Sequence, residues 1–91
     1  MATLIKPDGT LIDVHPENGT DFSLSELQEL VDGYIEIINL RNGEILVINE
    51  EGKGQYDINK LATDIALGFE AIFPNDFIVG DVLLCKNEQV Q

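Results

Sequence analysis

Residues 47–63, VINEEGKGQYDINKLAT, have the residue types of a phosphate-binding loop, since two glycines and a lysine precede a predicted helix start. Such a loop points glycine N–H groups and a lysine at the phosphates. The glycine spacing here matches neither common phosphate-binding pattern, and the acidic pair Glu50 and Glu51 would repel a phosphate. A turn explains the residues better, because Asn49 suits the first position of a type I turn and Gly52 the fourth.

Residues for catalysis or metal binding are scarce. The only histidine, His15, lies beside Pro16 in a predicted loop, and a Ser-His-acid set or a zinc site needs more than this. No calcium-loop pattern occurs, and the 17 acidic residues offer no carboxylate pair at a distinctive spacing. Cys85, the only cysteine, follows an apolar strand pattern and is expected in the core. We therefore predict no catalytic residue, no metal and no cofactor, and we expect no enzymatic activity.

The charge of the chain is strongly negative. The 17 acidic residues outnumber 5 basic ones, which gives a formal net charge of -12. The bases are scattered singly, so neither nucleic acid nor an anionic membrane is expected as a direct partner. The acidity either keeps the protein in solution or forms a face for a basic protein, including mimicry of a nucleic-acid backbone.

Turn and cap residues divide the first part of the chain. The PDG turn between residues 3–6 and 11–14 predicts a β-hairpin. Residues 22–33 carry helix signals, with Ser23 and Glu26 as a capping box and Gly33 as the left-handed C-terminal cap.

A second hairpin is predicted from residues 34–40 and 44–49, which are separated by an Asn-Gly turn. Ile35 and Ile37 mark the expected core face of its first strand, and its second strand is apolar on both faces and is expected inside the sheet.

The remaining elements are a helix at about 59–69 and a last strand at 76–85. Either Asp57 or Asn59 is suited to cap the helix, and its core face is expected to contain Ile58, Leu61, Ile65 and Phe69. Gly80 suggests a bend in the last strand. The sequence therefore predicts one α+β domain over residues 1–91, with elements in the order ββαββαβ. The expected architecture is a mainly antiparallel sheet with two helices packed on it. Residues 85–91 are expected to form a frayed tail.

Four short motifs carry a family resemblance. They are LVDGYIE (Leu30–Glu36), INEEGK (Ile48–Lys53), NKLAT (Asn59–Thr63) and Val79-Gly80. Residues 24–84 resemble in this way a family of small proteins of bacteriophages and bacterial mobile elements, domain of unknown function 3846. The chain departs from the usual pattern at Asp32, at Ile48 and in QYD before the helix. The resemblance implies an origin in a phage or mobile element and implies no activity.

Exposed polar and aromatic residues are expected where the far end of the second hairpin meets the second helix. One interpretation makes this edge an interface in which tyrosines anchor a partner and carboxylates select a basic one. In the other interpretation, the tyrosines lie at the boundary of the core and the remaining residues are solvated residues of turns. The candidate interface consists of Tyr34, Glu36, Asn49, Glu50, Glu51, Gln55, Tyr56 and Asn59.

Three functions fit these observations. The first is a non-enzymatic acidic accessory protein, cytoplasmic in a bacterial host, that binds a basic protein such as a host-defence or nucleic-acid-handling factor. The second is a module that binds a nucleotide-like ligand, which clustering of Arg41, Lys53 and Lys60 around a cleft would favour. The third is a structural or homo-oligomer-forming domain, favoured if an exposed sheet edge such as the last strand pairs between chains.

Overall fold

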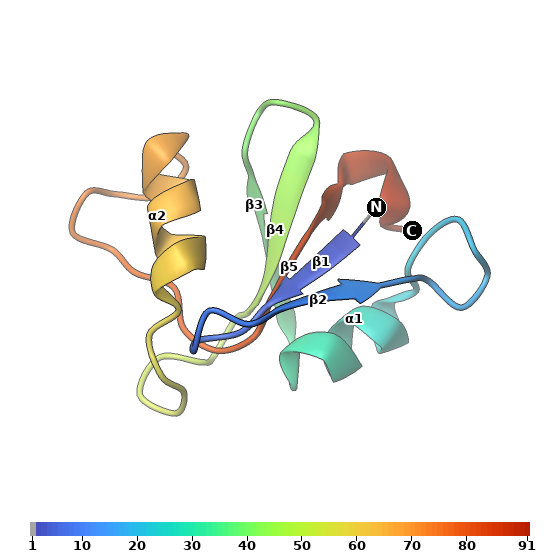
Figure 1. The fold of residues 1–91 in the computed structure, drawn as a ribbon, viewed down its shortest axis with the longest axis horizontal. Coiled ribbons are helices and arrows are strands. Elements are labelled where there is room, and N and C mark those ends of the chain that lie inside the picture. Colours follow the sequence, from blue (N-terminus) through green and yellow to red (C-terminus); the bar gives the residue numbers. More distant parts are fainter. Residues whose placement is uncertain (1) are drawn as a thin grey trace.

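Local turns and helix caps divide the chain into short elements, as the computed structural model of residues 2–91 shows (Figure 1). The order ββαββαβ is confirmed, and a short 3-10 helix, η1, follows the last strand. The elements are β1 (Ala2–Ile5), β2 (Leu11–Val14), α1 (Leu24–Val31), β3 (Ile35–Asn39), β4 (Glu44–Asn49), α2 (Lys60–Gly68), β5 (Val82–Lys86) and η1 (Asn87–Gln89).

The five strands form one antiparallel sheet in the order β2-β1-β5-β4-β3. β4 is paired on both sides, as its two apolar faces predict. β5 lies at the centre, between β1 and β4. The last strand is therefore not an exposed edge, and the expectation that it could pair between chains is wrong. The edges of the sheet are β2 and β3.

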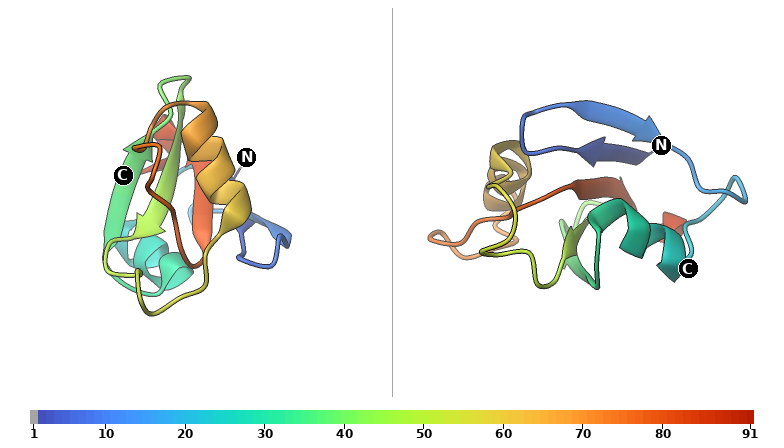
Figure 2. Two further views of the ribbon diagram at one scale, coloured as in Figure 1. Left: turned by 90° about the vertical axis from the view of Figure 1, so that its left-hand side faces the viewer. Right: turned by 90° about the horizontal axis from the view of Figure 1, so that it is seen from below.

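One helix packs on each face of the sheet (Figure 2). Because both faces are covered, the inner strands β4 and β5 are apolar on both sides. On the α1 face, the core consists of Ala2, Phe22, Leu27, Val31, Ile45, Val47, Leu83 and Cys85. On the α2 face, it consists of Ile38, Leu40, Leu46, Ala62, Ala66, Ile78 and Val82.

Helix α1 starts as its sequence predicts and ends one residue earlier. The Glu26 N–H donates to Ser23 Oγ at 3.2 Å, and Glu26 Oε1 accepts the Ser23 N–H at 2.9 Å, which completes the capping box. The left-handed residue at the other end is Asp32, with φ of 62°, and not Gly33. An aspartate tolerates this conformation better than most residues, so Gly33 is free to make the close approach to Asn49.

Helix α2 begins after Asn59 as expected, but it turns a different face to the sheet. The buried residues are Ala62, Thr63 and Ala66, while Leu61 is 39% exposed. The predicted core face is therefore wrong for Ile58, Leu61 and Phe69, which are exposed. It is confirmed for Ile65, which is partly buried and packs against the core of the α2 face. The cause is the helix start, because the buried Asn59 side chain is fixed to the sheet and so sets the rotation of the helix.

Two strand predictions also need correction. In β3, Ile37 is 46% exposed and Ile38 is buried, so the core face is only partly the expected one. The short helix α1 packs near Ile35 and leaves Ile37 uncovered, whereas Ile38 packs in the core of the α2 face. The last strand starts at Val82, not residue 76, because Gly80 adopts a φ of 76° that ends the preceding loop.

Residues 85–91, expected to be a frayed tail, are instead part of the fold. Cys85 belongs to β5 and is fully buried. Beyond η1, Val90 makes a parallel bridge with Phe22. The Phe22 N–H donates to the Gln89 carbonyl at 2.6 Å, and the Gln91 N–H donates to the Phe22 carbonyl at 3.1 Å. These bonds join residues far apart in the sequence, so no local pattern predicts them.

Candidate functional site

A groove of about 720 Å³ lies on the α2 face, between the edge strand β3 and the loop of residues 69–81 that joins α2 to β5. Glu36 and Ile38 face it from β3, and Ile48 faces it from β4. The floor is apolar, so it offers a surface that an apolar side chain would cover. The apolar residues that line it include Ile38, Ile48, Ala71, Ile72, Phe73, Phe77, Ile78 and Val79.

The charged residues of the groove are mostly acidic. Among the described residues that line it, five carboxylates accompany two cationic side chains, Arg41 and Lys53. Lys53 forms an ion pair with one of these carboxylates, so its charge is largely compensated. A cleft with an excess of one sign of charge attracts ligands of the opposite charge. The five carboxylates belong to Glu36, Glu50, Glu51, Glu70 and Asp76.

Lys53 ties the loop after α2 to the turn after β4. Its Nζ forms an ion pair with Asp76 Oδ1 and lies 4.6 Å from the centroid of the Phe77 ring. The same carboxylate oxygen accepts the Phe77 N–H at 2.8 Å. The Lys53 ammonium and this N–H hold the pKa of Asp76 below its usual value. The ion pair therefore links the loop after α2 to the turn after β4 at the surface of the protein.

The stretch after β4 is a turn, as the sequence predicts. The Glu51 N–H donates to Asn49 Oδ1 at 2.8 Å, and the Gly52 N–H donates to the Asn49 carbonyl at 3.4 Å. A side chain at Gly52 would place its Cβ 2.9 Å from Val79, so the glycine permits tight packing of the turn. Glu50 and Glu51 are exposed on this turn at the end of the groove.

Two of the predicted interface residues are buried and structural. Asn49 Nδ2 donates to the carbonyls of Val31 at 3.0 Å and Asp32 at 3.1 Å, which are left without helical partners at the end of α1. Asn49 borders the groove but is only 9% exposed. The prediction that it is an exposed interface residue is wrong.

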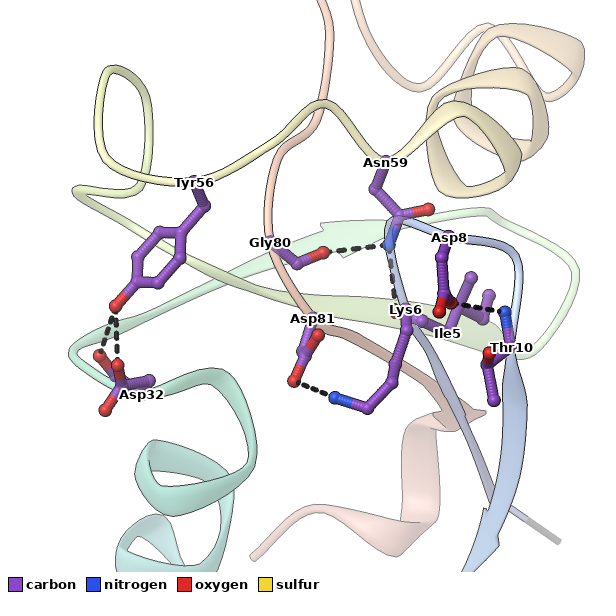
Figure 3. A network of polar contacts seen from close by, with 9 residues as sticks. All are labelled: Ile5, Lys6, Asp8, Thr10, Asp32, Tyr56, Asn59, Gly80 and Asp81. Carbon is purple, nitrogen blue, oxygen red and sulfur yellow. Dashed lines mark hydrogen bonds and ion pairs between the residues drawn. The ribbon is translucent and has the colours of Figure 1, made fainter.

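Asn59 is the second of these, and it is fully buried. Its Nδ2 donates to the carbonyls of Ile5 at 2.9 Å and Gly80 at 2.8 Å (Figure 3). Its Oδ1 accepts the Ala62 N–H at 3.1 Å and so caps α2. The side chain therefore joins the start of α2 to the last residue of β1 and to the loop before β5. The expectation that Asn59 lies in an interface is wrong.

The tyrosines and Gln55 do not line the groove. Tyr34 is 65% exposed. The Tyr56 hydroxyl donates to Asp32 Oδ2 at 2.6 Å (Figure 3), and this bond raises the pKa of Tyr56. Gln55 Nε2 donates to the Glu51 carbonyl at 3.2 Å. Of the eight predicted residues, Glu36, Asn49, Glu50 and Glu51 line one groove, and the other four do not.

The sequence interpretation missed the opposite wall. Glu70, Phe73, Asp76 and Phe77 line the groove from the loop after α2, and Phe73 is 78% exposed. The sequence does contain a signal for this wall. Two phenylalanines lie in a segment that also contains proline, asparagine and aspartate, which is typical of an exposed loop, so exposed apolar side chains were to be expected there.

The three bases that would mark an anion site are not gathered. Arg41 and Lys53 both line the groove. Lys60 does not, and its Nζ pairs with Asp64 Oδ2 at 3.1 Å on the exposed side of α2. The arrangement therefore lacks the cluster of three bases around a cleft that would favour a nucleotide-like ligand.

Residues 2–91 contain no group of three or more His, Cys, Asp or Glu side chains placed to hold a metal ion. Cys85 is buried as expected, and burial raises the pKa of its thiol to about 11, which disfavours the nucleophilic thiolate. In the part of the chain that the structure covers, neither helix has the length and apolar character of a membrane span.

The fold and the groove define a small α+β domain with an acidic, apolar-floored surface beside a sheet edge. The chain belongs to the family described as Domain of unknown function (DUF3846), whose model matches residues 2–90. Comparisons with curated proteins and with solved structures gave no match.

Proposed function

We propose that this protein is a non-enzymatic accessory protein of bacteriophage or mobile-element origin that binds a basic protein partner in the cytoplasm of a bacterial host. The partner belongs to the host-defence or nucleic-acid-handling factors, whose positive surfaces normally face nucleic acid. Direct binding to nucleic acid or to a membrane is not part of the proposal, because the net charge of -12 opposes both.

The single observation that supports this proposal is the combination of charge and apolar floor in the groove. Five carboxylates and two cations, Arg41 and Lys53, line a groove whose floor includes Ile38 and Ile48. The Lys53–Asp76 ion pair cancels one charge of each sign, so four carboxylates face Arg41 and the groove keeps a net negative charge. Carboxylates at the rim select a positive partner and speed its approach, while the apolar floor supplies affinity.

The test is affinity capture from host lysate with matched charge reversals. The groove variant carries Glu36→Lys, Glu50→Lys and Glu51→Lys. The control variant carries the same charge change at Glu17, Glu29 and Glu88, which are exposed and do not line the groove.

We expect the native chain and the control variant to retain a basic protein that the groove variant loses. The result is expected at low salt and at about 0.15 M salt. Equal loss in both variants would attribute binding to net charge alone and would contradict the proposal.

A nucleotide-like ligand is the second candidate, since Arg41 and Lys53 do line the groove. It is less well supported because the anion would meet five carboxylates there. This candidate would be favoured if the native chain captures no protein and binds a nucleotide saturably, and if Arg41→Ala abolishes that binding.

The third candidate, an oligomer-forming domain, would now require β2 or β3 as the pairing edge.

A further inference from the structure

Strand β3 has an unpaired edge that is open along the groove. It is the outermost strand of the sheet and is paired only with β4 among residues 2–91 (Figure 2). The Glu50 N–H donates to the Tyr34 carbonyl and the Leu40 N–H to the Glu44 carbonyl, so these residue pairs bond across the ladder.

In two antiparallel strands, every second residue of one strand bonds to the other strand. The residues between them point their backbone N–H and C=O groups away from that strand. The N–H and C=O groups of Ile35, Ile37 and Asn39 therefore face away from β4, toward the open edge. An edge of this kind is a template for another strand.

The groove gives this edge a preference for the chemistry of an added strand. Glu36 and Ile38 stand two residues apart on the groove face of β3. Directly opposite side chains in neighbouring strands lie about 5 Å apart, so the added strand would place one residue beside Glu36 and another beside Ile38. A lysine or arginine suits the first position and an apolar residue the second.

The other sheet edge does not offer the same arrangement. In the β1–β2 pair, the Lys6 N–H donates to the Thr10 carbonyl, so Lys6 and Thr10 bond across the ladder. By the same alternation, the backbone N–H and C=O groups of Leu11 and Asp13 face away from β1. None of the residues of β2 lines the acidic groove. β2 is therefore the natural control for β3.

We propose that the basic partner contributes an extended segment that pairs antiparallel with β3 as a further strand, with a basic residue beside Glu36 and an apolar residue two positions away beside Ile38. This rests on the proposed function and adds how the partner is recognised. Backbone hydrogen bonds to Ile35, Ile37 and Asn39 supply affinity, and the carboxylates with the apolar floor supply selectivity. Antiparallel pairing continues the arrangement of the whole sheet.

The probe is a blocked peptide that alternates Lys, Thr, Val and Thr, and the readout is amide hydrogen exchange of the full chain by NMR. We expect excess peptide to slow exchange at Ile35, Ile37 and Asn39 by about tenfold or more, whereas Glu36 and Ile38, already bonded to β4, change less. Glu36→Gln is expected to weaken the peptide's binding several-fold.

Two backbone changes test the hydrogen bonds themselves. Ile37→Pro removes an N–H that faces the open edge, and Asp13→Pro does the same on β2, so the two variants are matched in kind. Only Ile37→Pro is expected to weaken binding, by about tenfold. A peptide N-methylated at its Thr residues, which in antiparallel pairing face β3, is expected to bind about tenfold more weakly to the unaltered chain and so avoids any effect on folding.

Peptide binding that depends on Glu36 but leaves the exchange of Ile35, Ile37 and Asn39 unchanged would overturn strand addition while leaving the proposed function intact. Slowed exchange at Leu11 and Asp13 would overturn it in favour of the other edge. Protection of β3 that grows with protein concentration in the absence of peptide would assign the edge to a second copy of the chain. Failure of the peptide to bind would also overturn strand addition, whereas the proposed function stands or falls with the capture experiment.

Discussion

Replacing Asn59 by alanine is expected to remove a large part of the stability of the domain. The side chain is fully buried and makes hydrogen bonds to Ile5, Gly80 and Ala62. Loss of a helix N-cap costs about 1 kcal/mol. Loss of a donor to two carbonyls adds about 1 kcal/mol or more for each, so the expected total is about 3 kcal/mol. A chain of this length has a free energy of unfolding of roughly 5–14 kcal/mol, so Asn59→Ala leaves a folded but weakened protein.

Urea denaturation followed by circular dichroism measures this loss. With a denaturant slope of about 1.5 kcal/mol/M, the midpoint is expected to fall by about 2 M. Asn75→Ala, an exposed asparagine of the loop after α2, is the matched control and is expected to change stability by less than about 0.5 kcal/mol. A loss below about 1 kcal/mol for Asn59→Ala would show that only the cap matters and would refute the argument that this side chain fixes the rotation of α2.

Two further predictions concern titratable groups. The Cys85 thiol, fully buried with a pKa raised to about 11, is expected to react with a thiol reagent at pH 8 only at the rate at which the protein unfolds, and rapid labelling of the native protein would contradict this. The N–H groups of Ser23 and Glu17 lower the pKa of Glu26 in the folded protein, so its stabilising effect is present above the usual pKa of 4.5 and is lost as the pH falls through the lowered value. The destabilisation caused by Glu26→Gln is therefore expected to be larger at pH 7 than at pH 3, and a cost that does not shrink on acidification would contradict it.

Local signals in the sequence were enough to predict the element order. The Ser23–Glu26 capping box and the Asn-Gly turn act over a few residues, so their effect does not depend on the rest of the fold. The role of Asn59 as a cap was likewise within reach. Its contacts with Ile5 and Gly80 were not, because they join residues 54 and 21 positions apart.

The rotation of α2 shows why the core face was mispredicted. The helix carries a stripe of large apolar residues, including Leu61, and a stripe of small ones, including Ala62 and Ala66. Transfer free energy favours burial of the larger side chains. The tertiary contacts of Asn59 select the stripe of small residues instead.

The acidic half of the candidate site could be predicted, and the two phenylalanines of the opposite wall left a local signal, but the placement of that wall beside β3 could not be predicted. Glu36, Glu50 and Glu51 were identified because exposed carboxylates near a turn are visible in the sequence. The wall that contains Phe73 and Phe77 is anchored next to them by the buried Ile78, whose N–H donates to Thr63 Oγ1 at 2.9 Å. The wall is also linked to the turn after β4 by the Lys53–Asp76 ion pair, which spans 23 residues. Such a pairing depends on the path of the whole chain and has no local signature.

Carbodiimide crosslinking of the captured complex tests the central claim most directly, since it joins carboxylates to lysine amines of the partner without a spacer. The account predicts that peptide mapping by mass spectrometry finds these links at the carboxylates of the groove, Glu36, Glu50, Glu51, Glu70 and Asp76. Links confined to Glu17, Glu29 and Glu88, which lie outside the groove, would contradict it.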